Sequence, residues 1–356
     1  MWQFIVNSCF KWEETMNFNK NQSRRAFLKN SAAAGASALA ASTLFSTGAF
    51  ASAKTLKVGH IEAPNSATQK AYEAFAQKVA ERTNGSVNVE IYPAGQLGGL
   101  RDLYEGLRFG SVEMTSSGPD YVSNLVPVVV AGSLYYLWES NDHAREMLSG
   151  ANGAIFNKAL IEKAQIRNLA WGNLGFRSVF TNNRPIETPE DLKGLKIRVP
   201  EAKLHLEPMK AFGALPVGVP YAEVYTSLQT DVVSGAEGVP SAVLQQKFNE
   251  VSKYYSLTEH LFNPLMITIS ERFYQSLSTA EQEAVTESAR EAWADEWDAA
   301  IVDNSAALDK IAAGGVVINR PDKAAFAEIA QTSWASVLDP VGDEAWDIVK
   351  TFQRKA

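Results

Sequence analysis

The pattern of hydrophobic and polar residues predicts alternating strands and helices after residue 53. Short apolar or alternating runs predict strands over 55–59, 87–91 and 112–115, and helical periodicity predicts helices over 67–82 and 101–109. This βαβαβ order is typical of an α/β protein with a mostly parallel, helix-covered sheet. Such sheets bind ligands beyond the carboxyl ends of their strands, so Ser116-Ser117-Gly118-Pro119, which follows one strand, is a candidate site segment.

A second α/β unit follows, with strand-like segments at 169–171, 178–181 and 195–199. No internal repeat or low-complexity linker separates it from the first unit. We therefore expect the chain to cross between two domains more than once.

A long helix is predicted over 278–313. Ser278 and Glu281 have the spacing of a capping box, which indicates a helix start. At ~1.5 Å per residue, about 35 residues give a rod of roughly 50 Å, enough to run across two domains. We interpret the tryptophans of its apolar stripe as core packing, with ligand contact as the alternative. The stripe runs up to Gly314-Gly315 through Val285, Ala289, Trp293, Trp297, Ile301, Leu308 and Ile311.

The composition of the chain limits which class of protein it can be. With 356 residues, 46% of them apolar, the chain is long enough for two domains with ample cores. A net charge of −7 argues against broad binding to a phosphate backbone, so no nucleic-acid partner is expected. The single cysteine, Cys9, excludes an intramolecular disulfide framework and a Cys-rich zinc site.

The first 53 residues read as a signal peptide for export. Arg24 and Arg25 precede a mildly apolar run over 31–50, and small-x-small triplets place cleavage near Ala51 or Ala53. Paired arginines indicate the twin-arginine route to the periplasm. A membrane anchor is the alternative, but the Ala/Ser/Gly-rich run is weakly apolar for spanning. Either Met1 or Met16 is the start.

Cleavage there changes the charge and the cysteine content. It removes five basic and two acidic residues and leaves a net charge of −10. Cys9 departs with the leader, and no cysteine lies at the cleavage site, so no lipid anchor is expected there.

Motifs for catalysis or cofactor binding are not recognisable. His60, His143, His205 and His260 lack metal-ligand spacing, and no nucleophile elbow, Walker loop or dinucleotide fingerprint occurs. The Gly-rich turn over 95–99 precedes a helix; we interpret it as a plain helix start, with an anion site as the alternative. We expect no cofactor and no metal, and nothing demands an enzyme.

Two arginines in apolar surroundings are the main candidates for binding chemistry. Arg177 begins an apolar strand and Arg198 lies within another. A partly buried guanidinium needs an anionic partner or several acceptors. A structural ion pair and a ligand carboxylate both meet that need, and the sequence leaves the two open.

The order of motifs resembles the solute-binding proteins of tripartite ATP-independent periplasmic (TRAP) transporters, the dicarboxylate-binding-protein-like (DctP) family. The resemblance runs in order over about 55–315. The matching segments are ERTNG (81–85), YPAGQLG (92–98), GFR (175–177), RPIETPEDLKGLKIRVP (184–200), FGA (212–214), YAEVY (221–225), LQT (228–230) and KFNEV (247–251).

The resemblance implies a two-domain periplasmic binding protein of the type II-like class, with a hinge, an interdomain cleft and one long spanning helix. We expect a first domain over 54–176 plus about 265–280 and a second over 177–264. The helix over 278–313 would brace both, and 314–356 would pack on them. Such proteins capture an organic acid anion and deliver it to membrane permease subunits.

The resemblance also implies the ligand-binding residues. Arg198 is expected to clamp the ligand carboxylate, with Arg177 as a second cationic residue and Tyr221 as an aromatic contact. Ser117 and the segment at His60 are expected to supply polar contacts from the first domain. Glu237 is expected at the site as well.

Departures from the family pattern leave the acid open. Gly238 stands where many members have a ligand-facing asparagine, and Leu174 stands where an asparagine precedes the Gly-Phe-Arg. Fewer amides argue weakly against the best-known sugar-acid pattern, although backbone and water can substitute. A C4-dicarboxylate, a 2-oxo acid and a sugar acid are the candidates. The alternatives to transport are an exported sensor component and, as a weaker candidate, an exported enzyme acting on an organic acid.

Overall fold

The computed structural model describes residues 53–353. The predicted leader with its twin arginines, both possible start methionines and Cys9 lie outside the described residues, so those expectations stay predictions. None of the helices in the described part of the chain is long and apolar enough to cross a membrane.

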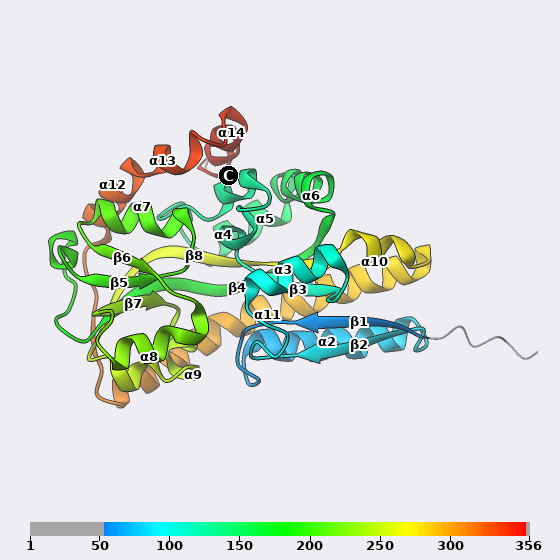
Figure 1. The fold of residues 1–356 in the computed structure, drawn as a ribbon, viewed down its shortest axis with the longest axis horizontal. Helices are drawn as coiled ribbons and strands as arrows, with labels where there is room; N and C mark the ends of the chain where they lie inside the picture. The colour runs from blue at the N-terminus through cyan, green and yellow to red at the C-terminus, as the bar shows by residue number, and fades with distance from the viewer. Residues whose placement is uncertain (1–52, 354–356) are drawn as a thin grey trace, which may run out of the picture. The chain divides into compact units, whose positions relative to one another are not determined.

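The described chain forms one nine-stranded sheet with helices packed around it (Figure 1). The strands follow the order β2-β1-β3-β8-β4-β7-β5-β6, with β9 also paired to β8. The strands are β1 (Lys54–Gly59), β2 (Val87–Tyr92), β3 (Met114–Ser117), β4 (Ile166–Thr181), β5 (Lys196–Val199), β6 (Leu215–Gly218), β7 (Gly235–Gly238), β8 (Tyr254–Ser270) and β9 (Val317–Asn319).

Helices connect these strands and follow them. The α-helices are α2 (Ala67–Arg82), α3 (Leu100–Phe109), α4 (Pro119–Val122), α5 (Asn141–Ser149), α6 (Ala151–Ala164), α7 (Lys203–Ala211), α8 (Val224–Gln229), α9 (Pro240–Gln245), α10 (Glu271–Ser276), α11 (Thr279–Ala313), α12 (Lys323–Thr332), α13 (Trp334–Leu338) and α14 (Asp343–Phe352). Short 3-10 turns are η1 (Pro127–Gly132), η2 (Pro189–Leu192), η3 (Tyr221–Glu223) and η4 (Phe248–Val251).

The early part of the chain confirms the predicted element order. Helix α2 has the predicted bounds, and β1, β2 and α3 differ from prediction by one residue at one end. The third strand starts two residues later than expected, because the Val112 amide donates to the Gly106 carbonyl and still closes the end of α3. The Gly-rich turn starts α3 as predicted, with Asp102 accepting from the Gly99 amide at 2.9 Å.

The sheet is mixed, which corrects the expectation of a mostly parallel sheet. Parallel pairs occur at its two ends, β2-β1-β3 and β7-β5-β6. Between them, β4 and β8 pair antiparallel along most of their length. β4 also pairs antiparallel with β7, and β8 pairs antiparallel with β3 and, at its start, parallel with β9. The segments predicted at 169–171 and 178–181 are parts of the one strand β4, whose pairing with β8 shifts register at three places.

The two long strands unite the described chain. Figure 1 shows β4 and β8 running between the two ends of the sheet, with α11 alongside. By their contacts, the described residues 53–353 all belong to one unit. Both ends of the sheet share β4 and β8. The predicted domain boundaries therefore stay a prediction about which parts of the chain move relative to each other.

The long helix α11 has the predicted length and packs against α2, β4 and α9. Trp293 and Trp297 are buried in the core, as predicted. Gly172 of β4 lets the helix approach, since a Cβ there would lie 2.5 Å from Trp293. The predicted stripe was wrong at Ile301, which is 38% exposed, because a surface hollow separates that part of the helix from β4 and β8.

We expect the capping box of α11 to contribute measurably to stability. The Ser278 hydroxyl accepts from the Glu281 amide, and the Glu281 carboxylate accepts from the Ser278 amide at 2.7 Å. Replacing an N-cap serine by alanine costs about 1 kcal/mol of unfolding free energy. Ser278→Ala should lose that amount in urea denaturation, whereas Ser305→Ala, at an exposed position inside the same helix, should not be destabilising. Equal losses would contradict a capping role.

Candidate functional site

A cavity of about 70 Å³ lies between the two ends of the sheet. Its wall comes from segments at the carboxyl ends of strands: Glu62 after β1, Ser117 at the end of β3, Pro200 after β5 and Val239 after β7. This is the position where α/β sheets bind ligands, as the sequence predicted. The space holds about five water-sized groups, which suits a small molecule.

Arg198 projects from β5 into this wall and is 2% exposed. Its Nε and Nη2 both donate to the carbonyl of Val219, at 2.9 and 2.7 Å. A guanidinium has five N–H donors, so three of them have no partner among the described residues. Burial lowers the pKa of Arg198, and Glu237 partly offsets that effect. The group is therefore a buried cation with an unfilled hydrogen-bonding edge, which an anion would satisfy.

Arg177 of β4 already has a carboxylate partner. Its Nε donates to Oε2 of Glu237, and its Nη2 donates to Oε1 at 2.7 Å. Nη2 also donates to the backbone carbonyl of Glu237 at 2.9 Å. Burial alone would raise the pKa of Glu237, but Arg177 and His260 hold it well below its usual range. Of the two alternatives, Arg177 thus makes the structural ion pair, while Arg198 makes none within the described chain.

The other predicted site residues divide into two groups. Tyr221 and Ser117 line the cavity; burial raises the pKa of Tyr221, so its hydroxyl stays protonated. The Ser117 hydroxyl lies 2.7 Å from the hydroxyl of Tyr104. His60 does not line the cavity: its Nε2 lies 2.8 Å from Gln69, and its ring stacks on Tyr72. The segment after His60 does reach the cavity, through Glu62.

Buried polar contacts connect the two ends of the sheet behind the cavity. His205 of α7 lies 3.0 Å from Asp120 of α4, and its other nitrogen is 3.4 Å from the Tyr135 hydroxyl. The Tyr135 ring packs on His260, whose Nε2 is 3.5 Å from Glu237. Burial lowers the pKa of His260, so the ring is neutral at pH 7. The pair of His205 and Asp120 therefore links a helix after β3 to a helix after β5.

Sequence reasoning missed several lining residues, notably Asp120 and Asn263. A signal existed for Asn263, because it is a lone amide inside the apolar strand β8. Gly118 is constrained by both, since a Cβ there would lie 2.2 Å from Asp120 and 2.8 Å from Asn263. Gly238 also lines the cavity, where a Cβ would make only ordinary contacts, so the missing side chain leaves space.

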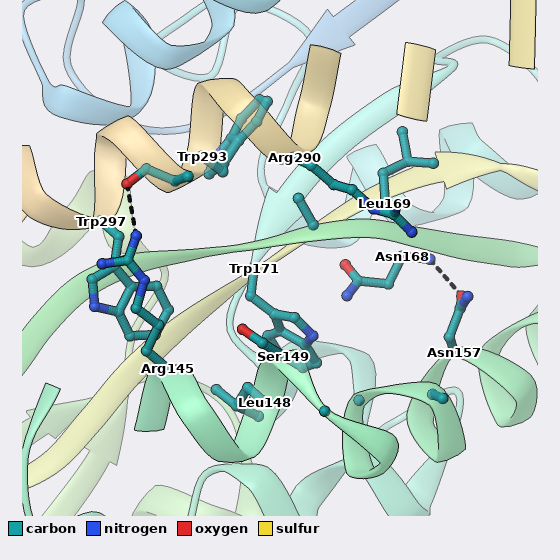
Figure 2. A pocket seen from close by; sticks show the side chains of 15 residues that line it. Arg145, Leu148, Ser149, Asn157, Asn168, Leu169, Trp171, Arg290, Trp293 and Trp297 are labelled. Carbon is teal, nitrogen blue, oxygen red and sulfur yellow. Dashed lines mark hydrogen bonds between the residues drawn. The ribbon is translucent and has the colours of Figure 1, made fainter. Parts of the chain in front are cut away.

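A larger surface hollow of about 450 Å³ lies between α5, α6, β4 and α11 (Figure 2). Its cations are already paired: Arg145 donates to Asp298 at 2.8 Å and to the Ala294 carbonyl, and Arg290 donates to Glu287. Figure 2 shows Arg145 beside Trp297. The distance from the guanidinium carbon of Arg145 to the ring centroid of Trp297 is 5.8 Å. None of the predicted site residues lines this hollow, so we place the candidate site in the cavity at Arg198.

A metal-dependent reaction has no support from the arrangement of side chains. Within residues 53–353, no group of three or more His, Cys, Asp and Glu side chains is placed to hold a metal ion. The cavity offers one buried cation with free donors, the ion pair of Arg177 and Glu237, hydroxyl and amide groups, and the carboxyl groups of Glu62 and Asp120. That arrangement can bind an anion.

Comparison with known proteins gives consistent matches over most of the chain. The family described as bacterial extracellular solute-binding protein, family 7 (DctP), matches residues 58–339. The 2,3-diketo-L-gulonate-binding periplasmic protein YiaO of Escherichia coli is 33% identical over 285 residues, 80% of this chain and 86% of that protein.

Solved structures agree with the same assignment. A TRAP periplasmic solute-binding protein from a Sulfitobacter species, with bound β-D-galacturonate, superposes with a TM-score of 0.81 at 31% identity, covering 84% of this chain and 99% of that one. One from Roseobacter denitrificans, with bound L-galactonate, has a TM-score of 0.79 at 32% identity, covering 85% and 99%.

Proposed function

This chain belongs to family 7 of the bacterial extracellular solute-binding proteins, the solute-binding proteins of TRAP transporters, and we propose that it captures a sugar-acid anion through Arg198. Members of this family are binding proteins of transporters, so the alternative of an exported enzyme is not supported. We further propose that it acts in the periplasm and delivers its ligand to the TRAP membrane permease subunits.

The observation that carries the proposal is the unfilled edge of the Arg198 guanidinium in a small cavity. Its remaining donors suit a carboxylate, which can accept two parallel N–H bonds. Because Glu237 pairs with Arg177, Arg198 is the lining cation without an ion-pair partner among the described residues. Tyr221, Ser117 and Asn263 add groups that can bond to hydroxyls. Three relatives named above are named for or hold sugar acids, which favours that class over C4-dicarboxylates. The diketogulonate in the name of YiaO is both a sugar acid and a 2-oxo acid, so a 2-oxo group is compatible with this class.

The missing amide at Gly238 is compatible with a sugar acid. The space left there accommodates part of a sugar, and Asn263 and Asp120, which sequence reasoning missed, line the same cavity. Polar groups from β8 and α4 are thus available in place of that amide.

We expect sugar acids to stabilise the protein against heat. A ligand at 100 times its dissociation constant adds about 2.7 kcal/mol, which at roughly 2–4 °C per kcal/mol raises the melting temperature by about 5–10 °C. Thermal shift and calorimetry with D-galacturonate, L-galactonate, succinate and pyruvate test this. D-galactose is the matched control, because it lacks the carboxylate and should give no shift.

Transport itself needs a second experiment. Vesicles containing the cognate permease should take up the acid only when the wild-type binding protein is present. Ligand binding without support of uptake would favour the sensor alternative, and turnover of the bound acid would favour an enzyme.

A further inference from the structure

A second, smaller chamber of about 30 Å³ lies next to the ligand cavity. Glu62, Leu174, Tyr221, Val239 and Ala242 line both spaces, so the two are adjacent along a shared wall. Arg198 lines only the first. At ~10–15 Å³ per water-sized group, the second chamber has room for about two such groups. It is the size of one end of a small ligand.

Two carboxyl groups in this chamber lack full hydrogen bonding. Glu296 of α11 is 3% exposed; its Oε2 accepts from the Asn173 amide at 2.9 Å, while its Oε1 has no partner within the described residues. Glu62 Oε2 is also buried without a hydrogen bond, 3.4 Å from Nδ1 of His60. Asp303 lines the chamber as well. Buried polar atoms are normally paired. Glu62 Oε2 has the equally unpaired Nδ1 of His60 beside it, so Glu296 Oε1 is the atom that points to a ligand.

The surroundings of Glu296 determine its protonation. Burial raises the pKa of Glu296 to about 8, and the charge of Glu62 adds to that rise, so Glu296 carries a proton at pH 7. A protonated carboxylic acid can donate one hydrogen bond, whereas a carboxylate only accepts. The chamber therefore presents one donor and one acceptor.

Resting on the proposed function, we propose that this chamber, through Glu62 and Glu296, binds a terminal hydroxyl of the sugar acid and selects against ligands with a second carboxylate. A hydroxyl both donates and accepts, so it can pair with each group in turn. A carboxylate could only accept, and it would face Glu62. A methyl group would offer these carboxyl groups no hydrogen bond. Glu62 and Glu296 are thus specificity-determining residues for a polyhydroxy monocarboxylate.

Three acids with one carbon skeleton test the proposal. L-galactonate ends in a hydroxymethyl group, its 6-deoxy analogue ends in a methyl group, and galactarate ends in a second carboxylate. By calorimetry at pH 7, wild-type protein should bind L-galactonate about 10-fold or more tightly than either analogue. Equal affinities for L-galactonate and the 6-deoxy acid would overturn the proposal. Galactarate binding as tightly as L-galactonate would also overturn it.

Variants of Glu62 separate charge from hydrogen bonding. Glu62→Gln removes the charge, so the preference for L-galactonate over galactarate should fall about 10-fold or more. Glu62→Leu removes the hydrogen-bond acceptor, so the variant should bind L-galactonate and the 6-deoxy acid with similar affinity. Asp295→Asn, which removes an exposed carboxylate next to Glu296 on α11, is the control and should leave both preferences unchanged. Unchanged preferences in both Glu62 variants would contradict the assignment.

A failure of the chamber proposal can be told apart from a failure of the proposed sugar-acid function. If none of the three acids nor D-galacturonate binds the wild-type protein, the sugar-acid function itself fails. If L-galactonate binds and Arg198→Ala abolishes that binding, the function stands. The affinities for the three acids and the affinities of the Glu62 variants then decide whether the chamber binds the terminal hydroxyl.

Discussion

Arg198→Ala should weaken binding of the best sugar acid by about 100-fold or more. Each charge-assisted hydrogen bond contributes about 1.5–3 kcal/mol, and a carboxylate would accept two from this guanidinium. Because 1.4 kcal/mol is a factor of ten, even the lower limit for two bonds exceeds 100-fold. Arg198→Lys should also weaken binding, since a point charge cannot reproduce the fork that holds both Val219 and a ligand.

The measurement is the dissociation constant by calorimetry, with folding checked by circular dichroism. Arg101→Ala is the matched control, because that side chain is 90% exposed and lies outside the cavity. Its dissociation constant should equal that of the wild type. An Arg198→Ala variant that is folded and binds with unchanged affinity would remove Arg198 as the clamp.

Glu237→Ala should destabilise the protein by about 3–5 kcal/mol. Removing one partner of a buried ion pair leaves the other charge uncompensated, and here Arg177 would lose both carboxylate bonds. At roughly 2–4 °C per kcal/mol the melting temperature should fall by about 6–20 °C. The double variant Arg177→Met/Glu237→Leu should be less destabilised than the sum of the single changes, because no unpaired charge remains.

The pH dependence gives a second readout of the same pair. The pKa of Glu237 is lower in the folded protein than in the unfolded chain, so its stabilising effect is full above the unfolded value of about 4.3. That effect is lost as the pH falls below 4.3 towards the folded value. The gap in unfolding free energy between wild type and Glu237→Gln should shrink over that range. A gap that stays constant from pH 7 to pH 3 would contradict a strongly depressed pKa.

Local elements of the fold could be predicted because their signals are local. The bounds of α2 and the length of α11 follow from helical periodicity and a capping residue within the same segment. Strand β4 was predicted only in pieces, because three register shifts along its pairing with β8 interrupt the alternation that identifies a strand.

The candidate site was predictable only in part, for a related reason. Arg177 and Arg198 could be singled out because charged residues are conspicuous in apolar strands. Which of them is already paired depends on Glu237, 60 residues along the chain from Arg177. The antiparallel pairing of β4 with β7 sets that contact: Ser178 stands opposite Gly238, and Val179 opposite Glu237.

The sequence by itself determined the element order, the long capped helix, the family and two arginines worth testing. Only the tertiary structure decided that Arg177 is neutralised, that Arg198 keeps free donors, and that Glu62 and Glu296 line one chamber although they come from a loop after β1 and from α11. The physical reason is that sheet register and helix packing set these contacts. A shift of one residue in a strand turns its side chains to the other face, and single-sequence patterns carry little information about which distant segment becomes a neighbour.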